Sequence, residues 1–173
     1  MIEQLQAEYG SFPGVLARWA ELQPSKPALR DDDGELSWAE LNDQVERIAV
    51  KLLETGLEQG QSVAILGTSC INYALTFLAA VRAGGVAAPL TTSASKEQLI
   101  GMARDSGARH LVIDATKRGE LGDDFLPELD HIAMEDFESW MAPEGARAPQ
   151  SDPDPNAPFN IIYSSVTTGI PKG

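Results

Sequence analysis

The segment YSSVTTGIPKG, residues 163–173, brings serine and threonine hydroxyls, two glycines and a lysine close together in the chain. The hydroxyls of Ser164, Ser165, Thr167 and Thr168 can donate hydrogen bonds, and glycine lets backbone N–H groups approach an anion closely. Lys172 adds a compact positive charge of the kind that binds phosphate. These residue types and their spacing have the chemistry of a polyphosphate cradle.

The segment differs from a Walker A loop, in which Gly-Lys-Ser/Thr runs directly into a helix. Here Pro171 precedes the lysine and Gly173 follows it. From the residues alone, a polar turn after a strand is the favoured interpretation, because loops rich in Gly, Ser and Thr are common, and the polyphosphate cradle is the alternative.

The residues before this segment predict that it leaves the end of a β-strand. FNIIY (159–163) is a short apolar run typical of a buried strand. Similar runs lie upstream, at 62–67, 86–90 and 109–114. Helical patterns at 71–83 and 95–107 separate those three runs, which predicts an α/β fold with a mostly parallel sheet flanked by helices. Ligands of such sheets bind at the carboxyl ends of the strands.

The N-terminal third shows three local signals. Ser11 is a plausible N-cap for a helix, and residues 28–36 predict a small β-hairpin near the N-terminus. Ser37 and Glu40 form a capping box, so we expect a second helix that Gly56 closes.

The pattern weakens after Ala115. A strand is predicted at 131–134 and a short helix at 135–141. The Pro-rich stretch 142–158 follows, and its composition predicts an irregular connection across the surface.

The overall charge restricts the partners. The formal net charge of the 173 residues is −13, and such a surface repels nucleic acid and anionic lipid, so neither nucleic acid nor a membrane is expected as a partner. The lone cysteine excludes an internal disulfide and fits a reducing compartment. The N-terminus lacks the basic start and apolar stretch of a signal peptide, so we expect a cytoplasmic protein.

Other reactive side chains are interpreted as structural. Cys70 is interpreted as a small buried residue, since it has no paired base in the sequence pattern. His110 and His131 lack further ligands at metal-binding spacing, so no metal site is predicted. Trp19 and Trp38 fall at helical positions and are expected to pack.

YSSVTTGIPKG resembles the Tyr-Thr-Ser-Gly-Thr-Thr-Gly-x-Pro-Lys-Gly signature of the adenylate-forming superfamily. That superfamily includes acyl- and aryl-CoA synthetases, luciferases and the adenylation domains of peptide synthetases. Residues 35–90 are similar to its N-terminal region in the order and spacing of their patterns, including an Ala-Gly-Gly turn before a Pro-Leu strand. The resemblance implies that residues 1–173 are the incomplete N-terminal part of the large AMP-binding domain, with 142–158 as a surface connection within it.

The resemblance also implies an activity, that of an acid–thiol ligase of the acyl-CoA synthetase type. Such an enzyme uses Mg²⁺ and ATP to convert a small carboxylic acid to an acyl-adenylate, and then passes the acyl group to coenzyme A. The loop would neutralise charge on the β- and γ-phosphates without covalent chemistry. The residues carried over by position as phosphate-binding are Ser164, Ser165, Thr167, Thr168, Gly169 and Lys172. No catalytic residue and no metal ligand is assigned within this chain.

Two departures from the family pattern bear on that activity. Val166 stands where the signature has glycine, and a β-branched residue is strained wherever φ is positive. The family's adenine-binding segment, ribose-binding acid and C-terminal lid have no counterpart among these residues, so the chain alone is expected to be inactive.

Three functions therefore stay open at this point. The chain is part of an acyl- or aryl-CoA synthetase, a non-catalytic α/β module for binding or assembly, or a degenerate relative marked by Val166. The apolar run 159–163 would leave an exposed edge, which predicts self-association as a homo-oligomer unless something covers it.

Overall fold

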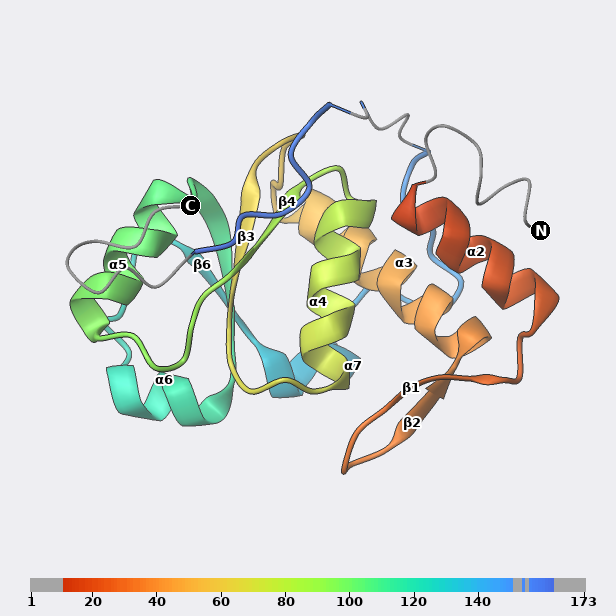
Figure 1. Ribbon diagram of the computed structural model, residues 1–173, viewed down its shortest axis with the longest axis horizontal. Coiled ribbons are helices and arrows are strands. Elements are labelled where there is room, and N and C mark those ends of the chain that lie inside the picture. Colours follow the sequence, from red (N-terminus) through yellow and green to blue (C-terminus); the bar gives the residue numbers. More distant parts are fainter. Residues whose placement is uncertain (1–10, 151–153, 155, 164–173) are drawn as a thin grey trace.

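The computed structural model describes residues 11–150, 154 and 156–163 (Figure 1). It has the α/β architecture that the sequence predicts, with a parallel sheet between two layers of helices. The strands are β3 (Ser62–Leu66), β4 (Val86–Pro89), β5 (Ala108–Ile113) and β6 (Asp130–Ala133). Their order is β4-β3-β5-β6, and every neighbouring pair is parallel.

The N-terminal elements form where the local signals predict them. Helix α2 (Phe12–Leu22) begins at Ser11, whose Oγ accepts a hydrogen bond from the N–H of Gly14. Strands β1 (Pro27–Arg30) and β2 (Glu35–Ser37) form the antiparallel hairpin.

Two long helices cover one face of the sheet. Helix α3 (Trp38–Glu54) starts with the predicted capping box and is followed by Gly56 at φ +92°, a conformation that glycine adopts without strain. Helix α4 (Ile71–Arg82) connects β3 to β4 and packs along α3. Their apolar side chains meet Val63, Ile65 and Val112 in the larger of two buried clusters.

The other face of the sheet is covered by helix α5 (Lys96–Asp105), which starts with the second predicted capping box, Ser95 with Gln98. Leu99, Met102 and Ala103 of α5 pack on Leu111 and further strand residues in the second buried cluster. Alternate residues of β3 point to opposite clusters, as the pleat of a strand requires.

Helix α6 (Ala115–Leu121), which follows β5, is an element that the sequence pattern did not reveal. Asp114 caps it by accepting a hydrogen bond from the N–H of Lys117. The helix is short and buries no residue completely, so its apolar periodicity is weak. Past β6, the helix predicted at 135–141 is a 3₁₀ turn, η1 (Met134–Asp136), joined to a short α-helix, α7 (Phe137–Trp140).

The run 159–163 is less regular than the predicted strand. Only Asn160 forms a β-bridge, parallel to Ala87 of β4, and the main chain exchanges two hydrogen bonds there. The segment therefore joins the sheet beside β4 in the predicted direction, but the strand assignment over all five residues was wrong. Ile162 is 73% exposed, so the side chains of this apolar run are not all buried.

The stretch from 142 to 150 has neither helix nor strand, but hydrogen bonds attach it to helices α3 and α4. Glu46 and Arg82 bind its main chain: Ala148 N–H donates to Glu46 Oε2 at 2.9 Å, and Arg82 donates to the carbonyls of Ala148 and Pro149. Ala142 and Ala148 are buried. Among the described helices, none is long and apolar enough to span a membrane.

Candidate functional site

The carboxyl ends of β3, β4, β5 and β6 lie at one edge of the sheet, because all four strands are parallel. The chain switches sides between β3 and β5, with α4 covering one face and α5 the other. Such a switch point is the usual ligand crevice of open α/β sheets.

At this switch point the chain places one of its own carboxylates. Asp114 accepts hydrogen bonds from Thr68 N–H at 2.8 Å and from Lys117 N–H at 2.7 Å, so both its oxygens are used. A Cβ on Gly67 would lie 2.9 Å from Asp114 Oδ2, which explains why glycine follows β3 directly. Asp114 therefore acts as a connector between β3 and α6 rather than as a free catalytic acid.

The loop after β4 carries exposed hydroxyls at the same edge. Thr91, Thr92 and Ser93 are exposed, and Thr91 Oγ1 and Ser93 Oγ lie 3.0 Å apart. No role was predicted for these residues from the sequence. The signal was the same as for 164–168, a hydroxyl run directly after an apolar strand.

The segment that carries the predicted phosphate loop reaches this edge on the free side of β4. Ala87 N–H donates to Phe159 O at 3.0 Å, and Ile161 N–H donates to Ala87 O at 2.9 Å. Since the pairing is parallel, Ile162 and Tyr163 follow in the direction of the carboxyl ends of the strands. In Figure 1 this dark blue segment passes β4 and continues towards α5.

Tyr163 ends the described part of the segment with a side-chain anchor. Its hydroxyl lies 2.8 Å from Met102 O and 3.0 Å from Asp105 Oδ2, both on α5. Burial, together with the hydrogen bond and the charge of Asp105, raises the pKa of the Tyr163 phenol to about 12. Tyr163 is therefore a neutral hydrogen-bond donor at any ordinary pH.

The predicted phosphate-binding residues lie outside the described part of the chain. They are Ser164, Ser165, Thr167, Thr168, Gly169 and Lys172. Val166, the departure from the signature, lies there too. The structure thus places the residues that lead into the loop, and the loop's own contacts stay a prediction.

The described residues contain no group of three or more His, Cys, Asp or Glu side chains that could hold a metal ion. Cys70 is half-buried at the start of α4, with its Sγ 3.8 Å from Met134 Sδ. His110 is fully buried in β5, and its Nε2 lies 2.9 Å from Thr55 Oγ1. Both residues serve packing in this part of the structure.

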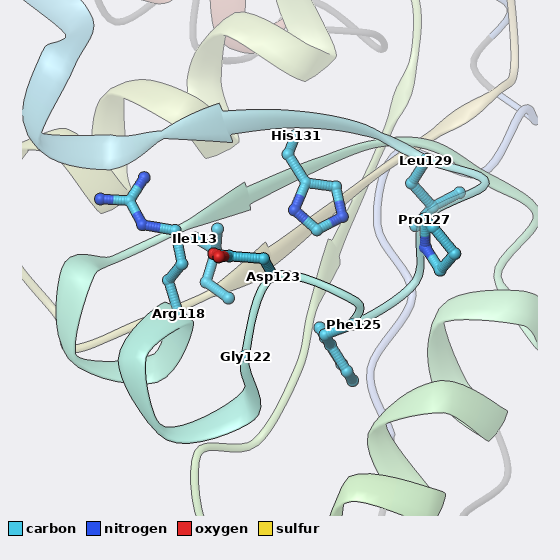
Figure 2. A pocket seen from close by; sticks show the side chains of 8 residues that line it. All are labelled: Ile113, Arg118, Gly122, Asp123, Phe125, Pro127, Leu129 and His131. Atoms are coloured by element: carbon cyan, nitrogen blue, oxygen red, sulfur yellow. The ribbon is translucent and has the colours of Figure 1, made fainter.

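A groove of about 390 Å³ lies between α6 and β6 (Figure 2). Two of its polar residues already have partners: His131 Nε2 lies 3.0 Å from Leu126 O, and Arg118 pairs with Glu135. β6 and β4 are at opposite ends of the strand order, so this groove is separate from the segment leading to the predicted phosphate loop.

Comparison with known proteins gives a consistent result. The AMP-binding enzyme family matches residues 16–173. Surfactin synthase subunit 2 of Bacillus subtilis is 30% identical over 159 residues, which are 92% of this chain and 4% of that protein. Enterobactin synthase component F of Escherichia coli O157:H7 is 28% identical over 170 residues, which are 98% of this chain and 13% of that protein.

Solved structures share the fold. O-succinylbenzoate coenzyme A synthetase of Bacillus subtilis, in complex with AMP, matches with a TM-score of 0.76 and 25% identity over 91% of this chain and 40% of that one. The N-terminal domain of FACL13 from Mycobacterium tuberculosis matches with a TM-score of 0.81 and 24% identity, over 93% of this chain and 42% of that one. The chain thus spans less than half the length of each of these relatives.

Proposed function

The chain belongs to the AMP-binding enzyme family, and we propose that it forms the N-terminal part of an enzyme that activates a carboxylic acid with ATP. In this reaction a carboxylate oxygen attacks the α-phosphorus of ATP. The bond from the α-phosphorus to the oxygen bridging to the β-phosphate breaks, and acyl-adenylate and pyrophosphate form. The family match is the observation that carries this proposal.

The loop from 164 to 173 is proposed to hold the leaving pyrophosphate. Hydroxyls and backbone N–H groups would bind the β- and γ-phosphate oxygens, and Lys172 would offset their negative charge. Mg²⁺ would arrive with ATP, since Mg²⁺ is commonly held through substrate phosphates and a few carboxylates. The parallel pairing of Asn160 with Ala87 supports this role, because it directs the chain towards the ligand-binding edge.

The acceptor of the acyl group is proposed to be coenzyme A, giving an acyl-CoA thioester. The solved relative named as a coenzyme A synthetase supports this choice. Surfactin synthase subunit 2 and enterobactin synthase component F are not named as coenzyme A synthetases, so we keep a second candidate acceptor, a thiol carried by a protein domain. Supplying the purified adenylating protein with coenzyme A, and separately with a pantetheine-bearing carrier domain, distinguishes the two acceptors.

The test of the first step is pyrophosphate–ATP exchange by the full-length protein with a panel of aliphatic and aromatic carboxylic acids. Exchange that depends on one class of acid is the expected result. Lys172→Ala should lower kcat/KM for ATP about ten- to hundredfold, since a hydrogen bond to a charged group contributes roughly 1.5–3 kcal/mol. The matched control is Lys51→Ala on α3, since Glu54 is the one ion-pair partner of Lys51 among the described residues. Absence of exchange with every acid would contradict the proposal.

A degenerate, non-catalytic relative is the other candidate function. Val166 in place of the signature glycine is the residue that favours it. Under this alternative the full-length protein keeps the fold, shows no exchange, and gains exchange when Val166 is replaced by glycine.

A further inference from the structure

We propose that Tyr163 is a positioning residue for the phosphate loop, acting through the hydrogen bond of its hydroxyl to α5. The inference rests on the proposed function, because it assigns Tyr163 a part in holding that loop. Tyr163 would make no contact with ATP itself. It would fix the point from which residues 164–173 start.

Two anchors lie within three residues of one another. The first is in the main chain, where Ile161 N–H donates to Ala87 O of β4 at 2.9 Å. The second is the Tyr163 side chain, whose hydroxyl is 2.8 Å from Met102 O and 3.0 Å from Asp105 Oδ2. The hydroxyl has one proton, so it donates to one of these oxygens at a time. Together the anchors fix the segment to the edge of the sheet and to the helix layer beneath it.

The α5 end of this anchor is itself held in place. Met102 is completely buried in the second cluster, against which the Tyr163 ring packs. The helix is capped at its N-terminus by Ser95 and Gln98. A hydroxyl bound to such a helix is held more firmly than one bound to an exposed loop.

Anchoring matters because a loop must be ordered when it binds phosphate. Fixing the backbone of a loop residue is entropically unfavourable, and ordering the start of the loop in advance removes part of that penalty before ATP arrives. Loss of the hydroxyl would therefore weaken ATP binding, and the carboxylate site would be unaffected. This predicts a change in KM for ATP with little change in kcat.

The experiment compares Tyr163→Phe with the unaltered full-length protein in pyrophosphate–ATP exchange. We expect KM for ATP to rise about two- to twelvefold, the range that loss of one ordinary hydrogen bond produces, with kcat and the KM for the acid nearly unchanged. Tyr73→Phe is the matched control, since no hydrogen bond joins the Tyr73 hydroxyl to another described residue. A purely structural role would instead lower kcat through loss of folded protein and leave KM for ATP unaltered, which would overturn the inference.

Asp105→Ala provides a second variant that keeps the Tyr163 hydroxyl. It should raise KM for ATP by a smaller factor, because Met102 O still accepts, and it should lower the pKa of Tyr163 from about 12. The tyrosinate absorbance of the two proteins measures that change. The double variant should raise KM for ATP little more than Tyr163→Phe alone does, since the two residues act through one contact. Fully additive effects on KM would contradict the inference.

Hydrogen exchange separates this inference from the proposed function, because it needs no ATP. Tyr163→Phe should speed amide exchange in residues 161–173 at least several-fold, while exchange in α3 and β3 stays unchanged. Unaltered exchange in 161–173 overturns the role of Tyr163, whether or not the protein binds ATP. If Tyr163→Phe speeds amide hydrogen exchange but the protein shows no pyrophosphate–ATP exchange, the role of Tyr163 as an anchor is supported and the proposed activity is rejected.

Discussion

Glu46 of α3 and Arg82 of α4 form a buried ion pair, with Arg82 Nε 2.6 Å from Glu46 Oε1 and side chains only 10% and 11% exposed. The pair also binds the main chain of Ala148 and Pro149. Its charges are thus matched by one another and by three backbone groups. This arrangement attaches the irregular stretch after Ala142 to both long helices.

Replacing Arg82 by Met should lower the free energy of unfolding by about 3–5 kcal/mol, because Glu46 would be left as an uncompensated buried charge. Urea unfolding measures the change. Lys51→Met is the control: Lys51 and Glu54 form an exposed pair, and its loss should change stability by less than about 1 kcal/mol. Equal losses of unfolding free energy in the two variants would contradict a larger contribution from the buried pair. Replacing Glu46 by Met as well should recover part of the loss.

Burial lowers the pKa of His110 below its usual 6.5; Arg109 also lowers it, and Asp130 and the Thr55 contact oppose the shift. Thr55 Oγ1 already donates to the main chain of α3, so His110 Nε2–H donates to Thr55, and Nδ1 is buried without a partner among the described residues. The folded state therefore favours the neutral ring.

The stability that neutral His110 provides should be complete above about pH 6.5. It should be lost as the pH falls from there to the lower pKa of the folded state, because the unfolded chain binds the proton first. Unfolding free energies measured from about pH 7.5 to 5 should fall more steeply for the unaltered protein than for His110→Gln. Identical slopes for the two proteins would contradict this assignment.

Gly85 and Gly119 should respond in opposite ways to alanine. A Cβ on Gly85 would lie 2.9 Å from the carbonyl oxygen of Gln61 and 3.0 Å from Leu57 Cδ2, so Gly85→Ala should lower stability by about 1–3 kcal/mol. A Cβ on Gly119 in α6 meets no atom within 4 Å, so Gly119→Ala should raise stability by about 0.5–1 kcal/mol. Thermal unfolding of the two variants checks the signs, and a stabilising Gly85→Ala would show that the β4 entry can adjust.

Val166→Gly in the full-length protein should increase pyrophosphate–ATP exchange. A β-branched residue at a position that needs positive φ is strained by roughly 1–3 kcal/mol, which corresponds to about five- to 150-fold in ATP binding if all of it is relieved. Val166→Ala separates strain from bulk, because alanine reduces the side chain but keeps a Cβ. Equal gains from Ala and Gly would point to bulk, and no gain from either would contradict the predicted effect of Val166.

Much of the fold follows from local signals, and the structure shows why. Ser37 and Ser95 each begin a helix, since a capping box depends only on residues within one turn. The apolar runs of β3, β4 and β5 are completely or nearly buried, so their composition reports their environment directly. The order of strands and helices, and with it the α/β class, could be predicted from the sequence for this reason.

Other features depend on contacts between distant residues. Arg82 looks in the sequence like an interruption of an apolar helix, and only the packing of α4 against α3 gives it Glu46 as a partner. The run 159–163 has the composition of a strand, but its pairing is limited to one bridge, because pairing requires a neighbouring backbone in register and not just apolar side chains.

The sequence by itself therefore determined the class of fold, the starts of the helices and the resemblance of the loop to a phosphate-binding signature, since all three are written in neighbouring residues. The tertiary structure decided which residues support that loop. Tyr163 reaches Asp105, 58 positions away in the chain, only because the segment beside β4 and helix α5 meet at the same edge of the folded sheet. Contacts of that separation arise from packing, which no local pattern encodes.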